Sequence, residues 1–521
     1  MSQFTEADSS VNRLNAAVTA FEKVLTEPEG TVVEMPIGAA QPSLAERLKR
    51  AVDAVTVKPA QAAAQASAAA QQAQAAQQSA AQSAADAANS AAATGYVDAP
   101  FPDVWAPLSD DLRLLAGIAP ADTITVAGTS YPLPTKSMTF TRSTTATYID
   151  KSGILQTAAI NEPRFEKEGL LIEGQGTNLV SNSQSTSAWR VANSTVTQAA
   201  VISPDGTATG VTKLASAGGA NTQTGAAISV PISGLSAGGY CSFSVFAKAD
   251  SHNLIQLRWL GGTTGVSNRY LNVDLSTGEI GANNLFYAKA ISMANGWWRI
   301  MAVTSIDGDL TGNTSADPGV ELIGSLTDGR RPAVSLATGV GVYLYGPQLE
   351  SGLSSSYIPT SGTVTTRANE TGALQAAGNC GYNLTGDLFE RTVAFELSVN
   401  VFSAPATGYH SAIAVAGAGN DIITRMRTDS LDSLRSANGL SPVIGVTYPF
   451  SKKLWIQTID ISNKVTAYFD GKIGVRTAAP ANPANAGLSI SFASNPNVVY
   501  HIRNFRIWHR ALTLNQIKGL R

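Results

Sequence analysis

The chain has 521 residues, 44% of them hydrophobic, which is enough for about two to four domains with sizeable cores. Only 14% of the residues are charged, against roughly 25% in ordinary soluble domains, and the formal net charge is -2 at pH 7. This near-neutral balance gives no support to a nucleic-acid partner or to binding at an anionic membrane surface.

The N-terminal segment, MSQFTEADSS, is polar and acidic and lacks the basic and apolar stretches of a secretory signal. We therefore expect a protein that is made without a signal peptide. The sequence contains no run of about 18 apolar residues, so membrane insertion is not expected either.

The first hundred residues have the pattern of helix and coil. Apolar residues recur at alternating spacings of three and four, as in an amphipathic helix or a short coiled coil, at Val11, Leu14, Val18, Phe21 and Leu25. A short strand is expected at 31–35. Ser43 and Glu46 then form a capping-box pair that predicts the start of a second helix, and Pro59 predicts its end or a restart.

Segment 60–93 is of low complexity, with 20 Ala and 8 Gln among 34 residues. Alanine has the highest helix propensity, and its small side chain lets several helices pack closely around one axis. Such a helix would form a rod of about 50 Å. The alternative is a disordered linker. Beyond it, three prolines between 100 and 107 predict a stiff joint, and a short helix is expected at 108–116 with Ser109 as its N-cap.

From Thr123 onward the pattern changes to short segments in which every second residue is apolar, separated by Gly, Asn, Asp and Ser. This period of two predicts half-buried strands, with examples at 241–249, 255–260, 297–303 and 340–345. Many such strands without a long helix predict β-sandwich domains, with a boundary near 360–372 and a short helical tail at 513–520.

The cysteines and histidines give no sign of a metal site. Cys241 and Cys380 fit two buried thiols best, and a single long-range disulfide is the alternative. The four histidines are His252, His410, His501 and His509. They have no cysteine at ligand spacing, so we expect no zinc, and no other metal or cofactor.

Several phrases resemble a module of phage tail fibres. They are TFTRSTTATYID (139–150), NEPRFEKEGLLIEGQGTNLVSNS (161–183), GVYLYGPQLESG (341–352) and SYIPTSGTVTTRA (356–368). In that module such phrases frame a jelly roll that is similar to carbohydrate-binding modules. Near the C-terminus, VTAYFDGK (465–472) and FRIWHRALTLNQI (505–517) resemble concanavalin-like or laminin-G-like lectin sandwiches.

The resemblance implies a mainly β protein in which two β-sandwich domains, 136–370 and 371–521, follow an N-terminal α-helical coiled-coil region. That region would comprise a virion-anchoring part (1–58) and a coiled-coil shaft (59–95), with a joint at 96–135. It further implies a homotrimeric tail fibre of the virion. Its N-terminus would attach to tail or adaptor proteins, and its β domains would bind a bacterial surface polysaccharide, either lipopolysaccharide or capsule.

Sugar binding needs flat aromatic faces and planar polar groups. Trp297 and Trp298 are adjacent in a predicted strand, so one faces the interior and the other either packs elsewhere or stacks on a sugar. Loops are the commoner binding surfaces. The candidate glycan-binding residues are Trp298, Tyr409, His410 and Asn438.

No pattern of catalytic residues stands out, so we expect a protein that is not an enzyme and name no catalytic residue. Segment 428–431, Thr-Asp-Ser-Leu, echoes the nucleophile block of some esterases, but it lacks the leading Gly and no Asp-x-x-His follows. Two alternatives stay open: a glycan depolymerase or deacetylase whose site is assembled between subunits, and a structural fibre section that carries a separate adhesin.

Overall fold

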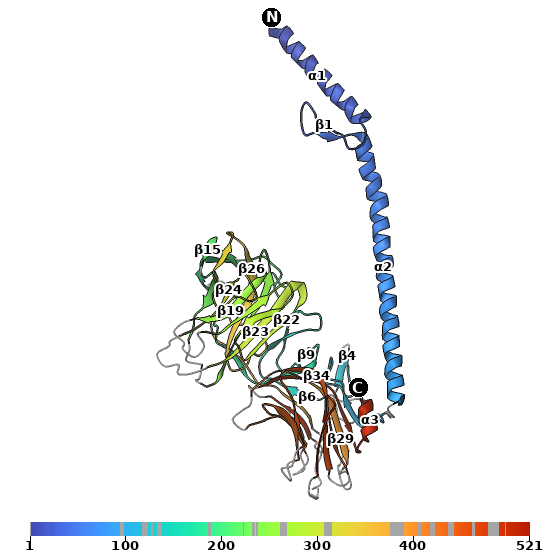
Figure 1. The fold of residues 1–521 in the computed structure, drawn as a ribbon, viewed down its shortest axis with the longest axis vertical. Helices are drawn as coiled ribbons and strands as arrows, with labels where there is room; N and C mark the ends of the chain where they lie inside the picture. The colour runs from blue at the N-terminus through green and yellow to red at the C-terminus, as the bar shows by residue number, and fades with distance from the viewer. Residues whose placement is uncertain are drawn as a thin grey trace. The chain divides into compact units, whose positions relative to one another are not determined.

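The computed structural model describes residues 2–93, 98–116, 123–126, 129–132, 138–185, 189–221, 223–231, 235, 238–260, 268–306, 315–375, 390–403, 408–416, 422–435, 442–460, 464–477, 489–494, 496 and 498–520. The chain forms two compact units, Met1–Val97 and Asp98–Arg521. The described part of the chain is mainly β, as predicted, and its long helices belong to the first unit (Figure 1).

The first unit consists of helix α1 (Ser2–Thr26), a small hairpin of β1 (Val32–Val33) and β2 (Gln41–Pro42), and helix α2 (Leu44–Ala93). Ala20 and Val24 of α1 pack against Val33 of the hairpin. The predicted helix start is confirmed, because the Ser43 Oγ accepts a hydrogen bond of 3.1 Å from the Glu46 amide. The Glu46 carboxylate accepts from the amide of Gly30 instead of completing the capping box.

Helix α2 continues through Pro59, where the sequence predicted an end or a restart. A proline inside a helix removes one hydrogen bond and costs about 3 kcal/mol. The Ala-rich segment that follows has the highest helix propensity of any sequence, and we infer that it propagates the helix beyond this defect.

The predicted apolar stripes of the first unit are exposed. On α1 they comprise Val11, Leu14, Val18, Phe21 and Leu25, and on α2 they comprise Leu44, Leu48, Val52 and Val55. These side chains are between 42% and 72% exposed. Both helices therefore present large apolar side chains that nothing within this chain covers among the described residues; the coiled coil itself stays a prediction.

The second unit begins with a correction. The helix expected at 108–116 is absent from these described residues, where Trp105 instead pairs with Ala116. The Leu115 amide donates to the Trp105 carbonyl at 2.7 Å. Leu108 and Leu114 are buried in the core of the unit. Burial of these two leucines outweighs the weak local preference for helix.

A middle β region, residues 189–351, contains two sheets. One has the order β12 (Trp189–Ala192), β16 (Gly225–Ile228), β24 (Ser315–Leu322), β19 (Leu254–Leu260), β20 (Tyr270–Asp274) and β21 (Ile280–Asn283). The other has the order β13 (Ser194–Gln198), β14 (Thr212–Ser216), β26 (Gly341–Ser351), β18 (Tyr240–Ala249), β23 (Trp297–Ser305) and β22 (Tyr287–Ser292). They enclose one core, in which Phe243 of β18 meets Trp259 of β19. The four predicted strands of this region are confirmed.

A terminal β region also contains two sheets. One has the order β36 (Lys472–Thr477), β35 (Lys464–Phe469), β34 (Phe450–Ile459), β29 (Arg391–Phe402), β38 (Val498–Trp508), β10 (Gly169–Glu173) and β9 (Phe165–Glu166), with β3 (Val104–Ala106) also paired to β38. The other has the order β33 (Val443–Gly445), β32 (Ser430–Arg435), β31 (Ile422–Met426), β30 (His410–Ala416), β37 (Ser489–Ala493), β28 (Thr371–Gln375) and β6 (Thr139–Thr141). Trp455 is buried in the core between them, as expected.

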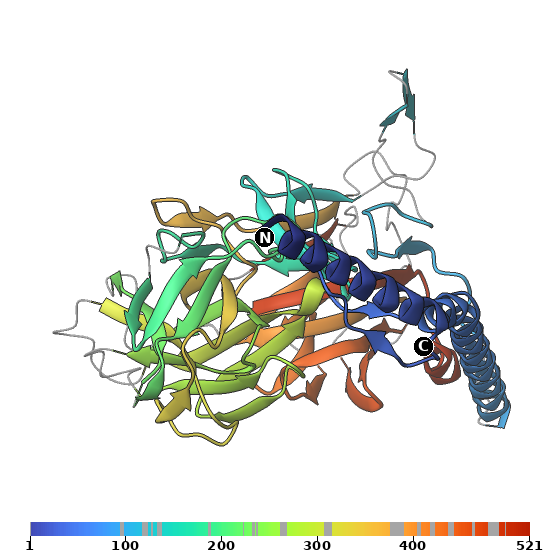
Figure 2. The same ribbon diagram turned by 90° about the horizontal axis from the view of Figure 1, so that it is seen from above.

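Strand pairing crosses the domain boundaries that the sequence suggested. Strand β3 comes from the expected joint, and β6, β9 and β10 come from the expected first sandwich, yet all four pair within the terminal β region. Figure 2 shows these early strands among the orange and red strands of the C-terminal part. Antiparallel partners can be far apart in sequence, so alternation alone does not show which sheet a strand joins.

Short-range signals near the C-terminus are confirmed. Asp470 and Gly471 form a two-residue turn with positive φ at both positions, between β35 and β36. Helix α3 (Leu514–Gly519) begins after Thr513, whose side chain forms a full capping box with Gln516. None of the described helices has the length and apolar character that crossing a membrane would require.

Candidate functional site

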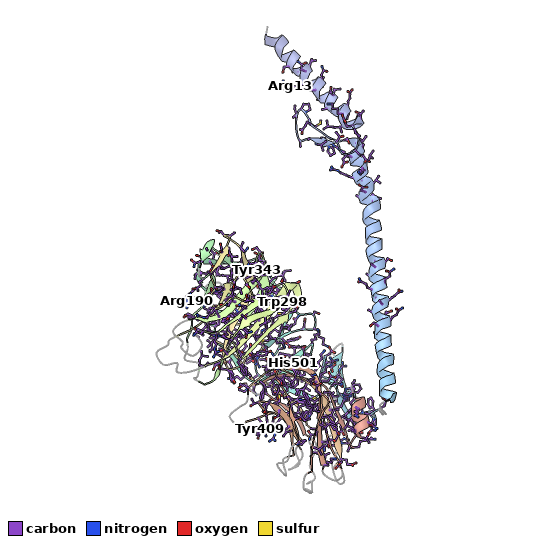
Figure 3. The ribbon with its side chains drawn as sticks, in the orientation of Figure 1. Arg13, Arg190, Trp298, Tyr343, Tyr409 and His501 are labelled. Atoms are coloured by element: carbon purple, nitrogen blue, oxygen red, sulfur yellow. The ribbon has the colours of Figure 1, made fainter. Side chains whose placement is uncertain are left out.

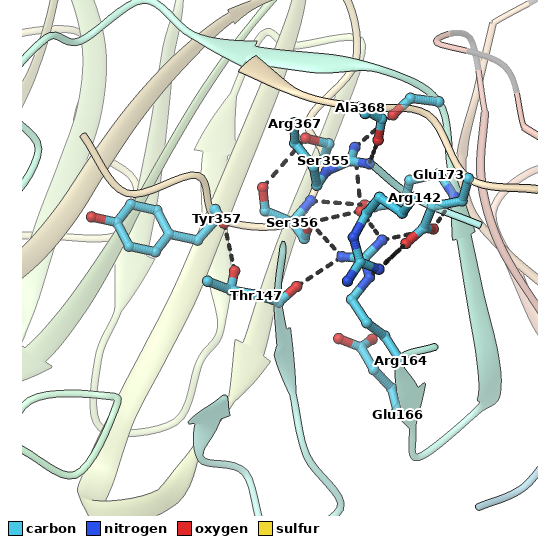
Figure 4. A network of polar contacts seen from close by, with 12 residues as sticks. Arg142, Thr147, Arg164, Glu166, Glu173, Ser355, Ser356, Tyr357, Arg367 and Ala368 are labelled. Carbon is cyan, nitrogen blue, oxygen red and sulfur yellow. Dashed lines mark hydrogen bonds and ion pairs between the residues drawn. The ribbon is translucent and has the colours of Figure 1, made fainter. Parts of the chain in front are cut away.

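The phrases that resemble the fibre module meet in one buried ionic network (Figure 4). Arg164 lies at its centre, with Nη2 at 2.7 Å from Glu173 and at 2.8 Å from Glu370. Arg142 makes a second ion pair to Glu370 at 2.8 Å, and Arg367 approaches Glu173 at 3.4 Å. All five side chains are at most 2% exposed.

In this network the partners of Glu173 and Arg164 shift the pKa of each towards its charged form. Burial alone would raise the pKa of Glu173, but Arg367 and Arg164 lower it well below its ordinary value. Burial would likewise lower the pKa of Arg164, and Glu370 and Glu173 raise it instead. A buried ion pair is stabilised only while both partners and their hydrogen bonds are present. The network therefore clamps segments from 142 to 370 to one another.

Glu350 is a second buried acid of the same phrases, with a different environment. Its carboxylate accepts hydrogen bonds from the amide and the hydroxyl of Ser355, at 2.8 and 2.6 Å. Burial raises the pKa of Glu350 to about 7, because these two hydrogen bonds only partly offset the loss of water.

A small cavity of about 30 Å³ lies beside the network, with room for about one water molecule. It borders Glu173, Arg299 and Tyr287. The Arg299 Nε and the Tyr287 hydroxyl are buried without a hydrogen-bond partner among the described residues. Tyr287 and Asn400 line this cavity and also the larger groove next to it.

That groove, here called the aromatic groove, has a volume of about 380 Å³ and lies between the middle and terminal β regions. The middle region contributes Tyr240 and Phe286, whose rings lie 4.6 Å apart. The terminal region contributes Phe402 and Tyr448, stacked at 4.8 Å. Phe286 is 50% exposed, so part of this aromatic surface is open to a ligand.

Polar groups complete the aromatic groove. Its described lining includes Asn400, Ser403, Thr428, Asp429 and Thr447. Thr428, Asp429 and Thr447 are exposed. Aromatic faces beside neutral donors and acceptors are the combination that sugar rings and their hydroxyls require.

The β regions that form the groove are held together by direct contacts. Leu171 and Val499 of the terminal region pack against Val303 of the middle region. The Lys289 ammonium donates to the Asn400 Oδ1 at 3.1 Å across the same boundary. These contacts fix the two walls of the groove relative to each other.

Trp298, a predicted glycan-binding residue, packs against the core of the middle β region (Figure 3). Its indole Nε1 donates to the Leu275 carbonyl at 2.8 Å. Its ring covers Gly278 so closely that a Cβ there would lie 2.2 Å away. Trp297 is fully buried, so this pair has a structural role in the described chain.

Tyr409 and His410 are also not among the described lining residues of the aromatic groove. Tyr409 is half-buried, with the guanidinium groups of Arg425 and Arg427 at 4.7 and 5.5 Å from its ring centre. His410 is buried, 5.9 Å from the ring of Tyr500. Asn438 lies outside the described residues, as does Cys380; Cys241 is a buried free thiol.

One group of side chains has the composition of a metal site. Glu166, Glu168 and His501 place ligand atoms within 4.8 Å of one another, although no metal was expected from the sequence. The His501 Nε2 lies 2.9 Å from the Glu166 carboxylate, so the pair is already joined by a hydrogen bond. The sequence could not single out this group, because His501 lies 335 positions from Glu166.

Sequence reasoning also missed the residues of the aromatic groove. Tyr240 is the first residue of β18, Phe286 directly precedes β22, and Tyr448 lies in a loop before β34, so no common motif joins them. One signal was available in the sequence: an aromatic residue that follows polar residues, as in Asn-Asn-Leu-Phe at 283–286.

Neither a protein-family model nor a curated protein sequence matches the chain. Part of it is similar to the receptor-binding domain of botulinum neurotoxin D, at 12% identity and a TM-score of 0.25, over 29% of this chain and 40% of that chain. The binding domain of botulinum neurotoxin DC in complex with SialylT gives 15% identity and a TM-score of 0.24, over 29% and 39%. The match thus spans less than half of these structures and carries no argument about fold or function.

Proposed function

We propose that the chain is the subunit of a fibre of the phage tail-fibre type, which binds a cell-surface glycan in the aromatic groove without cleaving it. The observation that carries glycan binding is the groove itself. It combines two aromatic pairs, Tyr240–Phe286 and Phe402–Tyr448, with the neutral polar lining of Asn400.

The fibre part of the proposal is supported by the first unit. Helices α1 and α2 carry exposed apolar stripes at the three-four spacing of a coiled coil. Further copies of the same chain would cover these stripes, and we propose a homotrimer whose N-terminal unit attaches to tail or adaptor proteins of the virion. The resemblance of the quoted phrases to fibre modules supports the same reading.

The resemblance also gives the finer fold of this proposal. The middle β region would be a jelly roll like those of carbohydrate-binding modules, and the terminal β region a concanavalin-like or laminin-G-like sandwich. In each region two sheets enclose a single core, which supports this assignment.

Binding without cleavage is supported by the charges at the groove. Hydrolysis of a glycosidic bond commonly uses two carboxyl groups about 5 to 9.5 Å apart. Among the described residues that line the groove, Asp429 is the single carboxylate.

The test is to incubate the purified full chain with host lipopolysaccharide or capsule and to follow both binding and the release of shortened glycan. We expect binding without release, and at least tenfold weaker binding by Phe286→Ala. Phe101→Ala is the matched control, because Phe101 is also exposed and lies against a second ring, that of Trp105, at 5.8 Å outside the groove. Release of shortened glycan would overturn the proposal of binding without cleavage. An equal loss of glycan affinity in Phe286→Ala and Phe101→Ala would show that the groove is not the binding site.

A further inference from the structure

The charge of the aromatic groove carries an inference about which glycans it accepts. Among its described lining residues, Asp429 is the only one with a charged side chain. Asp429 is exposed, and its carboxylate makes no hydrogen bond or ion pair with another described residue. An anionic sugar in the groove would therefore meet an unneutralised negative charge in place of a basic partner.

The remaining polar groups of the groove are neutral. Burial raises the pKa of the Tyr448 phenol, and the negative charge of Asp429 raises it further, so this hydroxyl stays protonated. Tyr448 donates its hydroxyl to the Ser430 carbonyl at 3.3 Å. Ser403, Thr428 and Thr447 supply hydroxyl groups, which can both donate to and accept from a sugar.

Arg427, which directly precedes Thr428, is paired with Asp432. Lys289 contacts the groove lining through Asn400, and it is already engaged. Its ammonium donates to the Asn400 Oδ1 at 3.1 Å, and it lines the neighbouring cavity on the other side of Asn400. Burial lowers the pKa of Lys289. With its oxygen occupied, Asn400 has its amide nitrogen left as a donor for an uncharged acceptor such as a hydroxyl or an acetamido carbonyl.

Anion-binding sites are built differently. Recognition of carboxylate or phosphate relies on Arg or Lys that reach the anion directly, most strongly through bidentate Arg contacts. No Arg or Lys is among the described lining residues of the groove. The buried Arg142 and Arg164 of the same unit are paired with Glu370 and Glu173, and the buried Arg299 borders the neighbouring small cavity.

We propose that the aromatic groove selects uncharged glycans, namely neutral hexoses and N-acetylhexosamines, and discriminates against acidic ones. This inference rests on the proposed glycan-binding function and specifies its substrate class. The Tyr240–Phe286 pair, in which Phe286 is half exposed, supplies a stacking surface for the apolar face of a neutral pyranose, and the Asp429 carboxylate accepts hydrogen bonds from its hydroxyls.

The test uses an array of bacterial O-antigen and capsule oligosaccharides in which each uronic-acid oligomer is paired with its methyl ester. Esterification removes the charge and leaves the rest of the sugar unchanged. We expect the full chain to bind neutral and esterified forms at least tenfold more tightly than the free acids. Asp429→Asn should narrow this ratio at least threefold by improving the binding of the acids.

Asp470→Asn is the matched control, since Asp470 is an exposed aspartate of the same region, paired with Lys453 at a hairpin outside the groove. Preference for the free acids would overturn the inference and leave glycan binding intact. The chain could prefer neutral over acidic oligosaccharides while Asp429→Asn and Asp470→Asn change that preference equally. This result would overturn the role given to the groove. Binding to no oligosaccharide on the array would overturn the proposed function together with the inference.

Discussion

At the residue scale, Glu350 makes the stability of the second unit depend on pH. Its pKa is about 7 in the folded chain, against an ordinary value of 4.5. The folded carboxyl keeps its proton while the unfolded one loses it, so the contribution of Glu350 to stability is highest below pH 4.5 and falls as the pH rises to 7. A raised pKa of this size corresponds to about 3 kcal/mol.

We predict that Glu350→Gln removes this loss. The free energy of unfolding of the variant, minus that of the wild type, should increase by about 3 kcal/mol between pH 4.5 and pH 8. Denaturant titrations at a series of pH values measure this difference. A difference that stays constant over the range would show that Glu350 is not the responsible group.

Arg164 gives the second prediction at this scale. Arg164→Met leaves Glu173 and Glu370 buried without their central partner, which should cost about 3–5 kcal/mol of stability. Arg190→Met is the control: Arg190 also pairs with an acid, Asp317, but its side chain is 60% exposed, so the loss should stay below about 1 kcal/mol. Similar midpoints of denaturation for the two variants would argue against the clamp.

The residues of this network show what a single sequence reveals. The burial of Trp455 and Trp508 was predictable, because large apolar side chains in alternating strands belong to cores. The pairing of Arg142 with Glu370 was not, because 228 positions separate the two and charge alone does not choose a partner. The phrases that resemble the fibre module drew attention to these segments, but they did not show which charged residues pair.

At the element scale, the elements with local signals were predictable and the others were not. The Asp470–Gly471 turn and the helical tail expected at 513–520 depend on neighbours within a few residues, and the tail is present as α3. The expected helix at 108–116 failed because its leucines are held by a core built from strands far along the chain. The groove was not predictable from the sequence for the same reason, since it is made where two regions meet; Trp298, Tyr409, His410 and Asn438 stay predictions.

The exposed stripe of α1 gives the prediction at this scale. Replacing Leu14 and Phe21 by Gln removes two of its largest apolar side chains, 63% and 59% exposed, and should reduce the number of subunits per particle. Light scattering of the full chain measures that number. The matched control changes Arg13 and Glu22 to Gln on the same helix and should leave it unchanged. A wild-type particle that contains one subunit would contradict the proposed homotrimer.

At the scale of the whole molecule, we expect the unfolding midpoints of the two compact units to depend differently on protein concentration. The middle and terminal β regions share the contacts of Leu171, Val303 and Val499, so they should melt in one transition whose midpoint does not depend on protein concentration. The helices of the first unit bury little within the chain, and an isolated Ala-rich helix is only marginally stable in water. If the helices associate as proposed, their stability comes from association, and we expect their midpoint to rise with concentration.

Circular dichroism at 222 nm follows the helices and tryptophan fluorescence follows the β regions, because all seven tryptophans lie in the second unit. Over a hundredfold range of protein concentration, we expect the helical midpoint to rise by several degrees and the fluorescence midpoint to stay fixed. A helical midpoint that ignores concentration would mean that the stripes are not covered by other copies. A fluorescence midpoint that rises in parallel would mean that the β regions themselves hold the subunits together.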